Sequence, residues 1–173
     1  SAATSTGHAA SAAVPTGLES ATPGEELGRL LAQVPWDRLT PGDLVVVLQA
    51  QQRQASHYQA GMYWTANHVV AAYEDLDCDD PTWLKEAADG AAAEIGAALR
   101  LTRRSSEIAT ELAVELLRRL PSVWAALLEG QIDLSRARVF VSGTCHLEVA
   151  AAQSVVEMLL PDAGLLTTGQ LAA

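Results

Sequence analysis

The stretch AEIGAALRLTRRSSEIATELAVELLRRLPSVWAALLEGQIDLSRARVFVSGT, residues 93–144, decides the fold of this chain. It predicts helices that are separated by three breaks: a cap at Thr102, the pair Leu120-Pro121 and a turn at Gly130. Asp133 can cap the helix after that turn, so the second half of the stretch is similar to a helix-turn-helix segment. Every expected element is helical, which indicates an all-α fold.

The rest of the chain agrees with a multi-helix domain built around one long helix. Of the 173 residues 49% are apolar, alanine is frequent and only one phenylalanine occurs, a composition that favours helices over strands. We expect a disordered tail over residues 1–21 and a single helical domain over 22–173. A short helix should follow a capping box at Thr22, and the long helix should run from the Thr40 cap to about Asp75. Shorter helices should pack against it.

Apolar and small residues recur along the long helix in alternating steps of four and three, as in a heptad pattern. The positions are Leu44, Leu48, Gln51, Ala55, Tyr58, Met62, Thr65, Val69, Ala72 and Leu76. We favour the interpretation that this stripe faces the core of one domain. The alternative is an oligomer seam formed by Leu48, Ala55, Tyr58, Met62 and Val69.

Charge is unevenly distributed. The chain has a net charge of −10, which argues against a general nucleic-acid binder, yet seven of its eleven basic residues lie between Arg100 and Arg138. The arginines that are candidates for contact with DNA phosphates are Arg103, Arg104, Arg118, Arg119, Arg136 and Arg138. Glu107, Glu111 and Glu115 recur every four residues beside them, so ordinary helix-surface ion pairs are the competing interpretation. Arg136 and Arg138 are two residues apart and should point to different sides of their helix.

The sequence contains no recognisable catalytic or metal-binding motif. His57 and His68 share a helix face but lie about 16 Å apart, too far to bind one ion. The acidic segment 77–81 lacks the central glycine of a calcium loop, so we expect a solvated loop. Cys145 follows an apolar run and is expected to be buried. We therefore predict no catalytic residue, no metal and no cofactor in this chain.

Other partner classes are also disfavoured. Two cysteines fit a reducing cytoplasm, and no apolar run is long enough for a membrane span. A small-molecule pocket lined by Tyr58, Trp64 and His68 is a further hypothesis, but aromatic residues on a long helix usually belong to the core. We expect no small-molecule ligand and no membrane partner. We do expect the chain to form a homo-oligomer.

Several packing and capping motifs resemble a known family. They are the run Ala93-Glu94-Ile95 to Leu101, the segment from Leu112 to Leu120-Pro121, Leu127 with Gly130-Gln131-Ile132, and the pair Ala137-Arg138. Together they resemble the domain of unknown function 222 family, also called the 13E12 repeat family, from about Leu39 onward. These motifs identify a family more readily than an activity.

The resemblance implies a role. Members of this family, which occur mainly in high-GC bacteria, often carry this helical region before an HNH endonuclease domain. We therefore expect a non-catalytic region, truncated before a possible C-terminal HNH nuclease domain, that positions the nuclease on DNA or mediates oligomerisation. A divalent metal is expected only for that nuclease domain. The alternative is a self-association module without any nucleic-acid contact.

Overall fold

The computed structural model describes residues 14–75 and 83–173, and these residues form helices and loops without a strand. The expected all-α fold is confirmed. The expected tail up to Ala13 and the acidic segment 77–81 lie outside the described residues. The elements are α1 (Glu25–Leu31), α2 (Pro41–Glu74), α3 (Trp83–Leu99), α4 (Arg103–Val114), a π-helical turn η1 (Glu115–Arg119), α5 (Pro121–Leu128), α6 (Leu134–Thr144), α7 (Val149–Ala163) and α8 (Thr168–Leu171).

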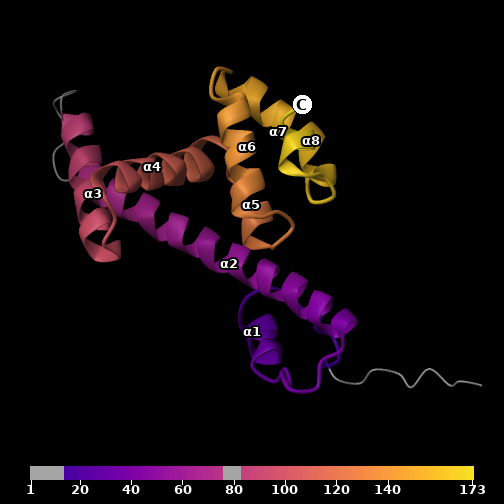
Figure 1. Ribbon diagram of the computed structural model, residues 1–173. Helices are drawn as coiled ribbons and strands as arrows, with labels where there is room; N and C mark the ends of the chain where they lie inside the picture. The colour runs from indigo at the N-terminus through magenta and orange to yellow at the C-terminus, as the bar shows by residue number, and fades with distance from the viewer. Residues whose placement is uncertain (1–13, 76–82) are drawn as a thin grey trace, which may run out of the picture.

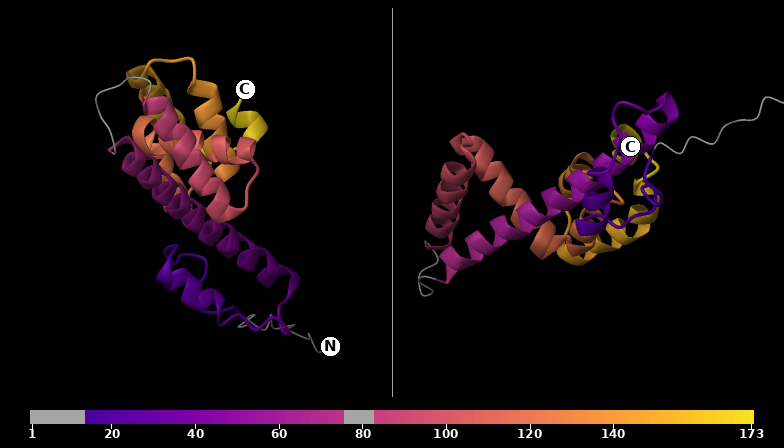
Figure 2. Two further views of the ribbon diagram at one scale, coloured as in Figure 1. Left: turned by 90° about the vertical axis from the view of Figure 1, so that its left-hand side faces the viewer. Right: turned by 90° about the horizontal axis from the view of Figure 1, so that it is seen from below.

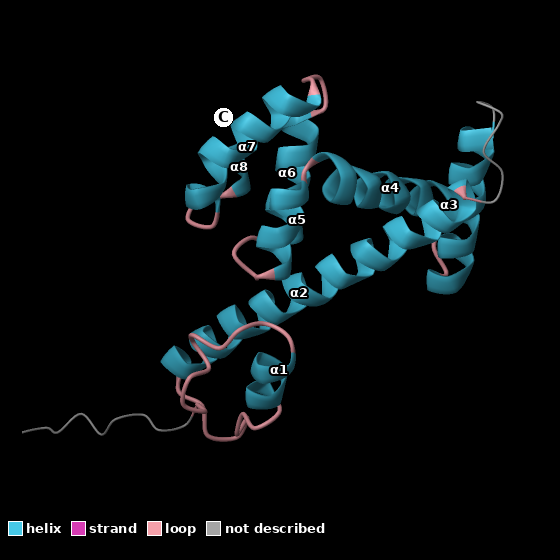
Figure 3. Cartoon of the chain, turned by 180° about the vertical axis from the view of Figure 1, so that it is seen from behind, coloured by secondary structure: helices cyan, strands magenta, loops and turns pink. Residues whose placement is uncertain are grey.

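Helix α2 is the axis of the molecule. It has 34 residues and is therefore about 51 Å long. Helices α3 and α4 pack at its C-terminal half, α5 crosses its middle, and α1 lies beside its N-terminal half (Figure 1). The two turned views show α1 and α5 on different sides of α2 (Figure 2), and the view from behind shows α6, α7 and α8 stacked beyond α5 (Figure 3).

The helix starts predicted at Thr40, Thr102 and Asp133 are confirmed by their hydrogen bonds. Thr40 and Asp43 form a capping box, in which the Asp43 amide donates to Thr40 Oγ1 at 3.2 Å and the Thr40 amide to the Asp43 carboxylate at 2.9 Å. Thr102 caps α4 and Asp133 caps α6 in the same way. Gly130 has φ 69°, the left-handed conformation that ends α5.

The main core fills the space between the middle of α2, η1, α5, α6 and α7. It includes Leu116, Leu120, Val123, Leu127 and Phe140, of which none is more than 3% exposed. Phe140 lies in the centre of α6, so the second helix of the helix-turn-helix-like segment is a core helix.

A second, smaller core attaches the N-terminal segment to α2. Leu18 is 1% exposed, and it packs with Leu27 and Leu30 against Val47 and Ala50 of α2. The packed part of the chain therefore begins before the expected boundary at residue 22.

The capping box expected at Thr22 does not form. Helix α1 begins after Gly24, which has φ 113° and offers no side chain as a cap. The Gln54 side chain holds this glycine instead: the Gly24 amide donates to Gln54 Oε1 at 2.9 Å, and Gln54 Nε2 donates to the Gly24 carbonyl at 3.1 Å.

Two further helix boundaries differ from those that local residue chemistry suggests. The helix that begins at Arg103 does not continue regularly to Leu120, because its last turn widens into η1. Helix α7 passes Pro161 and ends at Ala163. The Arg136 guanidinium donates to the Ala163 and Leu166 carbonyls and holds this last turn against α6.

Candidate interaction surface on helix α2

The stripe along α2 points to solvent, so its assignment to the core is wrong. Leu44, Leu48, Tyr58 and Met62 are each at least half exposed. We use the name α2 stripe for the part of the pattern from Leu44 to Val69: Leu44, Leu48, Gln51, Ala55, Tyr58, Met62, Thr65 and Val69. The oligomer seam proposed from sequence, Leu48, Ala55, Tyr58, Met62 and Val69, belongs to this surface, and only Val69 is partly covered.

The stripe remains exposed because the neighbouring helices pack on other sides of α2. Its buried positions are mostly small or polar: Asp43, Val47, Ala50, Gln54, Ser56, Ala60 and Val70. Small side chains let neighbouring helices approach closely, as where the Trp124 indole donates to the Ala60 carbonyl at 3.0 Å. Helices α1, α4 and α5 use these faces, and the larger apolar side chains of the stripe remain outside.

The α2 stripe carries no formal charge. Between Leu44 and Tyr73 the only Asp, Glu, Lys or Arg is Arg53. Its guanidinium turns toward the N-terminal segment and donates to the Leu18 carbonyl at 2.8 Å. The eight residues of the α2 stripe are therefore uncharged on a chain of net charge −10.

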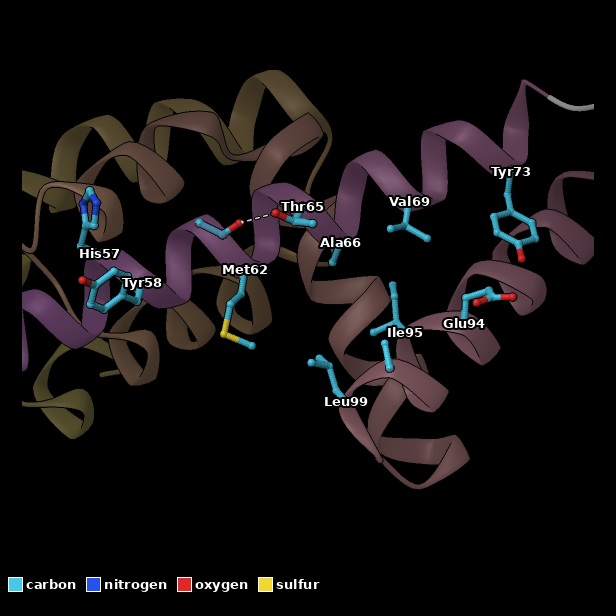
Figure 4. A pocket seen from close by; sticks show the side chains of 12 residues that line it. His57, Tyr58, Met62, Thr65, Ala66, Val69, Tyr73, Glu94, Ile95 and Leu99 are labelled. Carbon is cyan, nitrogen blue, oxygen red and sulfur yellow. Dashed lines mark hydrogen bonds between the residues drawn. The ribbon is translucent and has the colours of Figure 1, made fainter. Parts of the chain in front are cut away.

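At its C-terminal half the stripe borders a groove of about 670 Å³ between α2 and α3. Met62 and Val69 of α2 face Ile95 and Leu99 of α3 across it (Figure 4). The remaining lining residues are His57, Tyr58, Gly61, Thr65, Ala66, Tyr73, Glu94 and Ala98. The α3 wall was missed in the sequence, although Ile95 and Leu99 are one helical turn apart and could have indicated an apolar edge.

Tyr73 and Glu94 close one end of the groove. Partial burial of the phenol, together with the negative charge of the nearby Glu94 carboxylate, raises the pKa of Tyr73. The Tyr73 ring also lies against Gly90, where an added Cβ would come within 2.8 Å of it. This contact joins the end of α2 to α3 and leaves Glu94 as the acidic residue of the groove.

The hypothesised small-molecule trio does not come together. Tyr58 lines the groove, whereas Trp64 and His68 do not. The Trp64 and His68 rings stack on one another with centroids 3.7 Å apart. His57, the other histidine of α2, faces the Leu128 carbonyl with its Nδ1 at 2.8 Å and so contacts the end of α5.

Three of the six candidate arginines connect helices. Arg118 forms a two-point ion pair with Glu74, with both N–O distances 2.9 Å, and donates to Asn67 Oδ1. Arg119 pairs with Glu115 and donates to the Thr144 and Leu147 carbonyls at 2.5 and 2.6 Å. Arg136 pairs with Asp133 and holds the end of α7.

The other three are more accessible. Arg103 pairs with Glu107 at 2.8 Å while its side chain is 84% exposed, and this hydrogen bond raises the pKa of Arg103. Arg104 and Arg138 are exposed and form no ion pair with residues 14–75 or 83–173. Arg138 points away from Arg136, as their spacing predicts, into the clefts beside α6. Arg100, which was not among the six, lies exposed at the α3–α4 corner with φ 54°.

The described residues form neither a metal site nor a membrane span. Within the described ranges no three His, Cys, Asp or Glu side chains are placed to hold one metal ion, and no helix is long and apolar enough to cross a membrane. Cys145, expected to be buried, is an exposed free thiol, because α6 ends at Thr144 and the residue points out of the following turn.

Comparison with known families gives one match. The model of the family described as Domain of unknown function (DUF222) matches residues 47–173, which includes most of α2 and every later helix. The comparisons with curated proteins and with solved structures gave no match.

Proposed function

The chain belongs to the DUF222 family, and from this premise we propose that its helical region is a non-catalytic module that joins two copies of the protein through α2. One observation carries the proposal: the heptad-spaced α2 stripe, which has the pattern of a helix interface, is exposed to solvent and uncharged. A contiguous apolar face of this kind usually marks an interaction site.

The size of the surface fits a weak, reversible contact. The stripe from Leu44 to Val69 is about 38 Å long and about 10–12 Å wide, so it offers roughly 400–450 Å² for face-to-face packing. Two copies would then bury roughly 850 Å² in total, which is in the range of transient interfaces. The acidic surfaces elsewhere repel one another, so the uncharged face is where two copies meet at the lowest electrostatic cost.

Light scattering across a concentration series tests the proposal. We expect a dimer for the wild type and a monomer for Leu48→Glu, because each buried leucine contributes about 1.5–3 kcal/mol and the site occurs twice in a symmetric dimer. Leu165→Glu is the matched control: Leu165 is 86% exposed in the connection between α7 and α8, outside the α2 stripe, and its replacement should leave the dimer intact. A wild-type protein that stays monomeric at every concentration contradicts the proposal.

Contact with DNA is the second candidate function. The favouring observation is the exposure of Arg103 and Arg104 at the start of α4, with Arg100 at the same corner. The double variant Arg103→Ala/Arg104→Ala tests it by fluorescence anisotropy with duplex DNA. Phosphate contacts weaken as salt is added, whereas association of two acidic copies strengthens with salt, so the sign of the salt dependence separates the two functions.

Both candidates fit the architecture implied by the family resemblance. In an HNH endonuclease of a reducing cytoplasm, a module that pairs two copies would bring two nuclease domains to one DNA duplex. The metal and the catalysis would then belong to the nuclease domain.

A further inference from the structure

The spacing of the α2 stripe is compatible with a second copy that runs in the opposite direction. From Leu44 to Val69 its steps are four, three, four, three, four, three and four, a series that is the same from either end. An alternating series of this kind can meet an antiparallel copy in several registers, so the spacing alone does not choose one. Centred between Ala55 and Tyr58, an antiparallel partner places a stripe residue opposite every stripe residue and brings the N-terminal half of each α2 against the C-terminal half of the other.

We propose that α2 binds α2 of a second copy in this antiparallel register, with Leu44 and Leu48 of each copy inserted beside the α2–α3 groove of the other. This inference rests on the proposed self-association and adds its orientation, its register and the role of the groove. In this register Leu44 lies opposite Val69, Leu48 opposite Thr65, and Ala55 opposite Tyr58.

The two halves of α2 are complementary in shape. In the N-terminal half Leu44, Val45 and Leu48 project from the helix and are 50–65% exposed. In the C-terminal half α3 stands beside α2 and creates the apolar groove along Met62 and Val69 (Figure 4). Under a two-fold axis the ridge of each copy meets the groove of the other, so the same contact forms twice. This is the requirement for an isologous interface.

The scarcity of charge on both surfaces favours a second copy as the partner that fills the groove. The groove is lined by apolar groups along its length, with Glu94 at the Tyr73 end. The ridge that would enter it carries no charge between Leu44 and Gln52. A parallel arrangement is disfavoured because it would place each ridge against the other ridge and leave both grooves unfilled.

Disulfide trapping tests the register. In a background with Cys78→Ser and Cys145→Ser, the double variant Leu48→Cys/Thr65→Cys should form a covalent dimer with two disulfides under mild oxidation, seen on a non-reducing gel. Each single variant should remain unlinked, because like positions lie about 26 Å apart along the axis, and a disulfide needs Cα atoms within about 7 Å. Both positions are exposed, so the substitutions leave the core untouched.

The outcomes separate the register from self-association. Linkage of Leu48→Cys alone places the two copies of this position side by side, as in a parallel pair or an antiparallel pair centred on Leu48, and overturns the register while it supports self-association. A dimer by light scattering in which neither the single nor the double variants become linked also overturns the register alone. A monomer by light scattering overturns both proposals. The groove has its own test: Ala98→Trp, which fills it from the exposed side of α3, should raise the dimer dissociation constant at least tenfold, and an unchanged constant excludes the groove from the interface.

Discussion

Arg118 and Glu74 are 44 residues apart in the chain and form a two-point ion pair between η1 and the last residue of α2. Both side chains are about one-third exposed. The π-helical turn widens the helix at this point and sets Arg118 beside α2, where Asn67 accepts a third hydrogen bond from it. The pair thus connects the end of the long helix to the main core.

We expect Arg118→Ala to lower the free energy of unfolding modestly. A partly exposed pair of good geometry contributes about 0.5–1 kcal/mol, and a double-mutant cycle with Glu74→Gln should return a coupling of this size in urea titrations. Additive effects of the two substitutions would show that the pair contributes nothing to stability.

Arg119→Ala should lower the free energy of unfolding more than Arg118→Ala does, although the two residues are adjacent. Its side chain is only 13% exposed, and it donates to the Thr144 and Leu147 carbonyls at the α6–α7 connection. The Leu147 amide also donates to the Thr144 carbonyl at 3.0 Å, so Arg119→Ala leaves the Leu147 carbonyl without this donor and Glu115 without its ion pair. Loss of these partly buried partners costs about 2–3 kcal/mol. Arg119→Lys should rescue little, since an ammonium group cannot bond both carbonyls and Glu115 in the same planar arrangement. Thermal unfolding of the three proteins gives the ranking, and equal melting temperatures for the Arg118 and Arg119 variants would contradict it.

Gly130→Ala should destabilise the protein by about 2–3 kcal/mol, because φ is positive and space is lacking. An added Cβ would lie 2.9 Å from the Cβ of Arg53 and 3.2 Å from its Cα on α2. Gly143→Ala is the control: it lies in α6 with no atom within 4 Å of the added group, and it should stabilise by about 0.5–1 kcal/mol. Chemical denaturation of both variants checks the opposite signs.

Alkaline pH should weaken the contact between α2 and α3. The raised pKa of Tyr73 means that the folded protein holds this proton more tightly than the unfolded chain does. Its contribution to stability is therefore complete below the ordinary tyrosine pKa of about 10 and is lost as pH rises above it. Tyr73→Phe should flatten the decline of stability above pH ~10, measured by denaturation across pH.

The local chemistry of helix ends was predictable from sequence, whereas the partner of each helix face was not. Thr40, Thr102 and Asp133 each cap a helix through contacts within three residues, so spacing alone suffices. The heptad pattern of α2 predicts a face suited to another helix, but it cannot say whether that helix belongs to the same chain. Here α1, α4 and α5 bind the faces rich in alanine and small polar residues.

The arginines likewise had local contacts that sequence could predict and distant contacts that it could not. The pairs Arg103–Glu107 and Arg119–Glu115 have the i, i+4 spacing of helix-surface pairs. The partner of Arg118 is Glu74 instead of the nearby Glu115, because η1 changes the direction of the side chain, and no local residue preference indicates a π-helical turn. The sequence therefore identified the candidate arginines, but it did not show which of them form contacts between helices and which remain exposed.

The two hydrogen bonds between Gln54 and Gly24 attach the N-terminal segment to α2, and this contact bears on where a fragment of the protein should begin. The family match starts at Val47, inside the second turn of α2. A fragment that starts there would lose the Thr40–Asp43 cap and uncover Val47 and Ala50, which Leu18, Leu27 and Leu30 now shield from water. Such a fragment would expose fresh apolar surface next to the α2 stripe and aggregate for reasons unrelated to its natural contacts. A fragment that begins at or before Val14 retains this cover, and in it any association that is measured reports on the stripe itself.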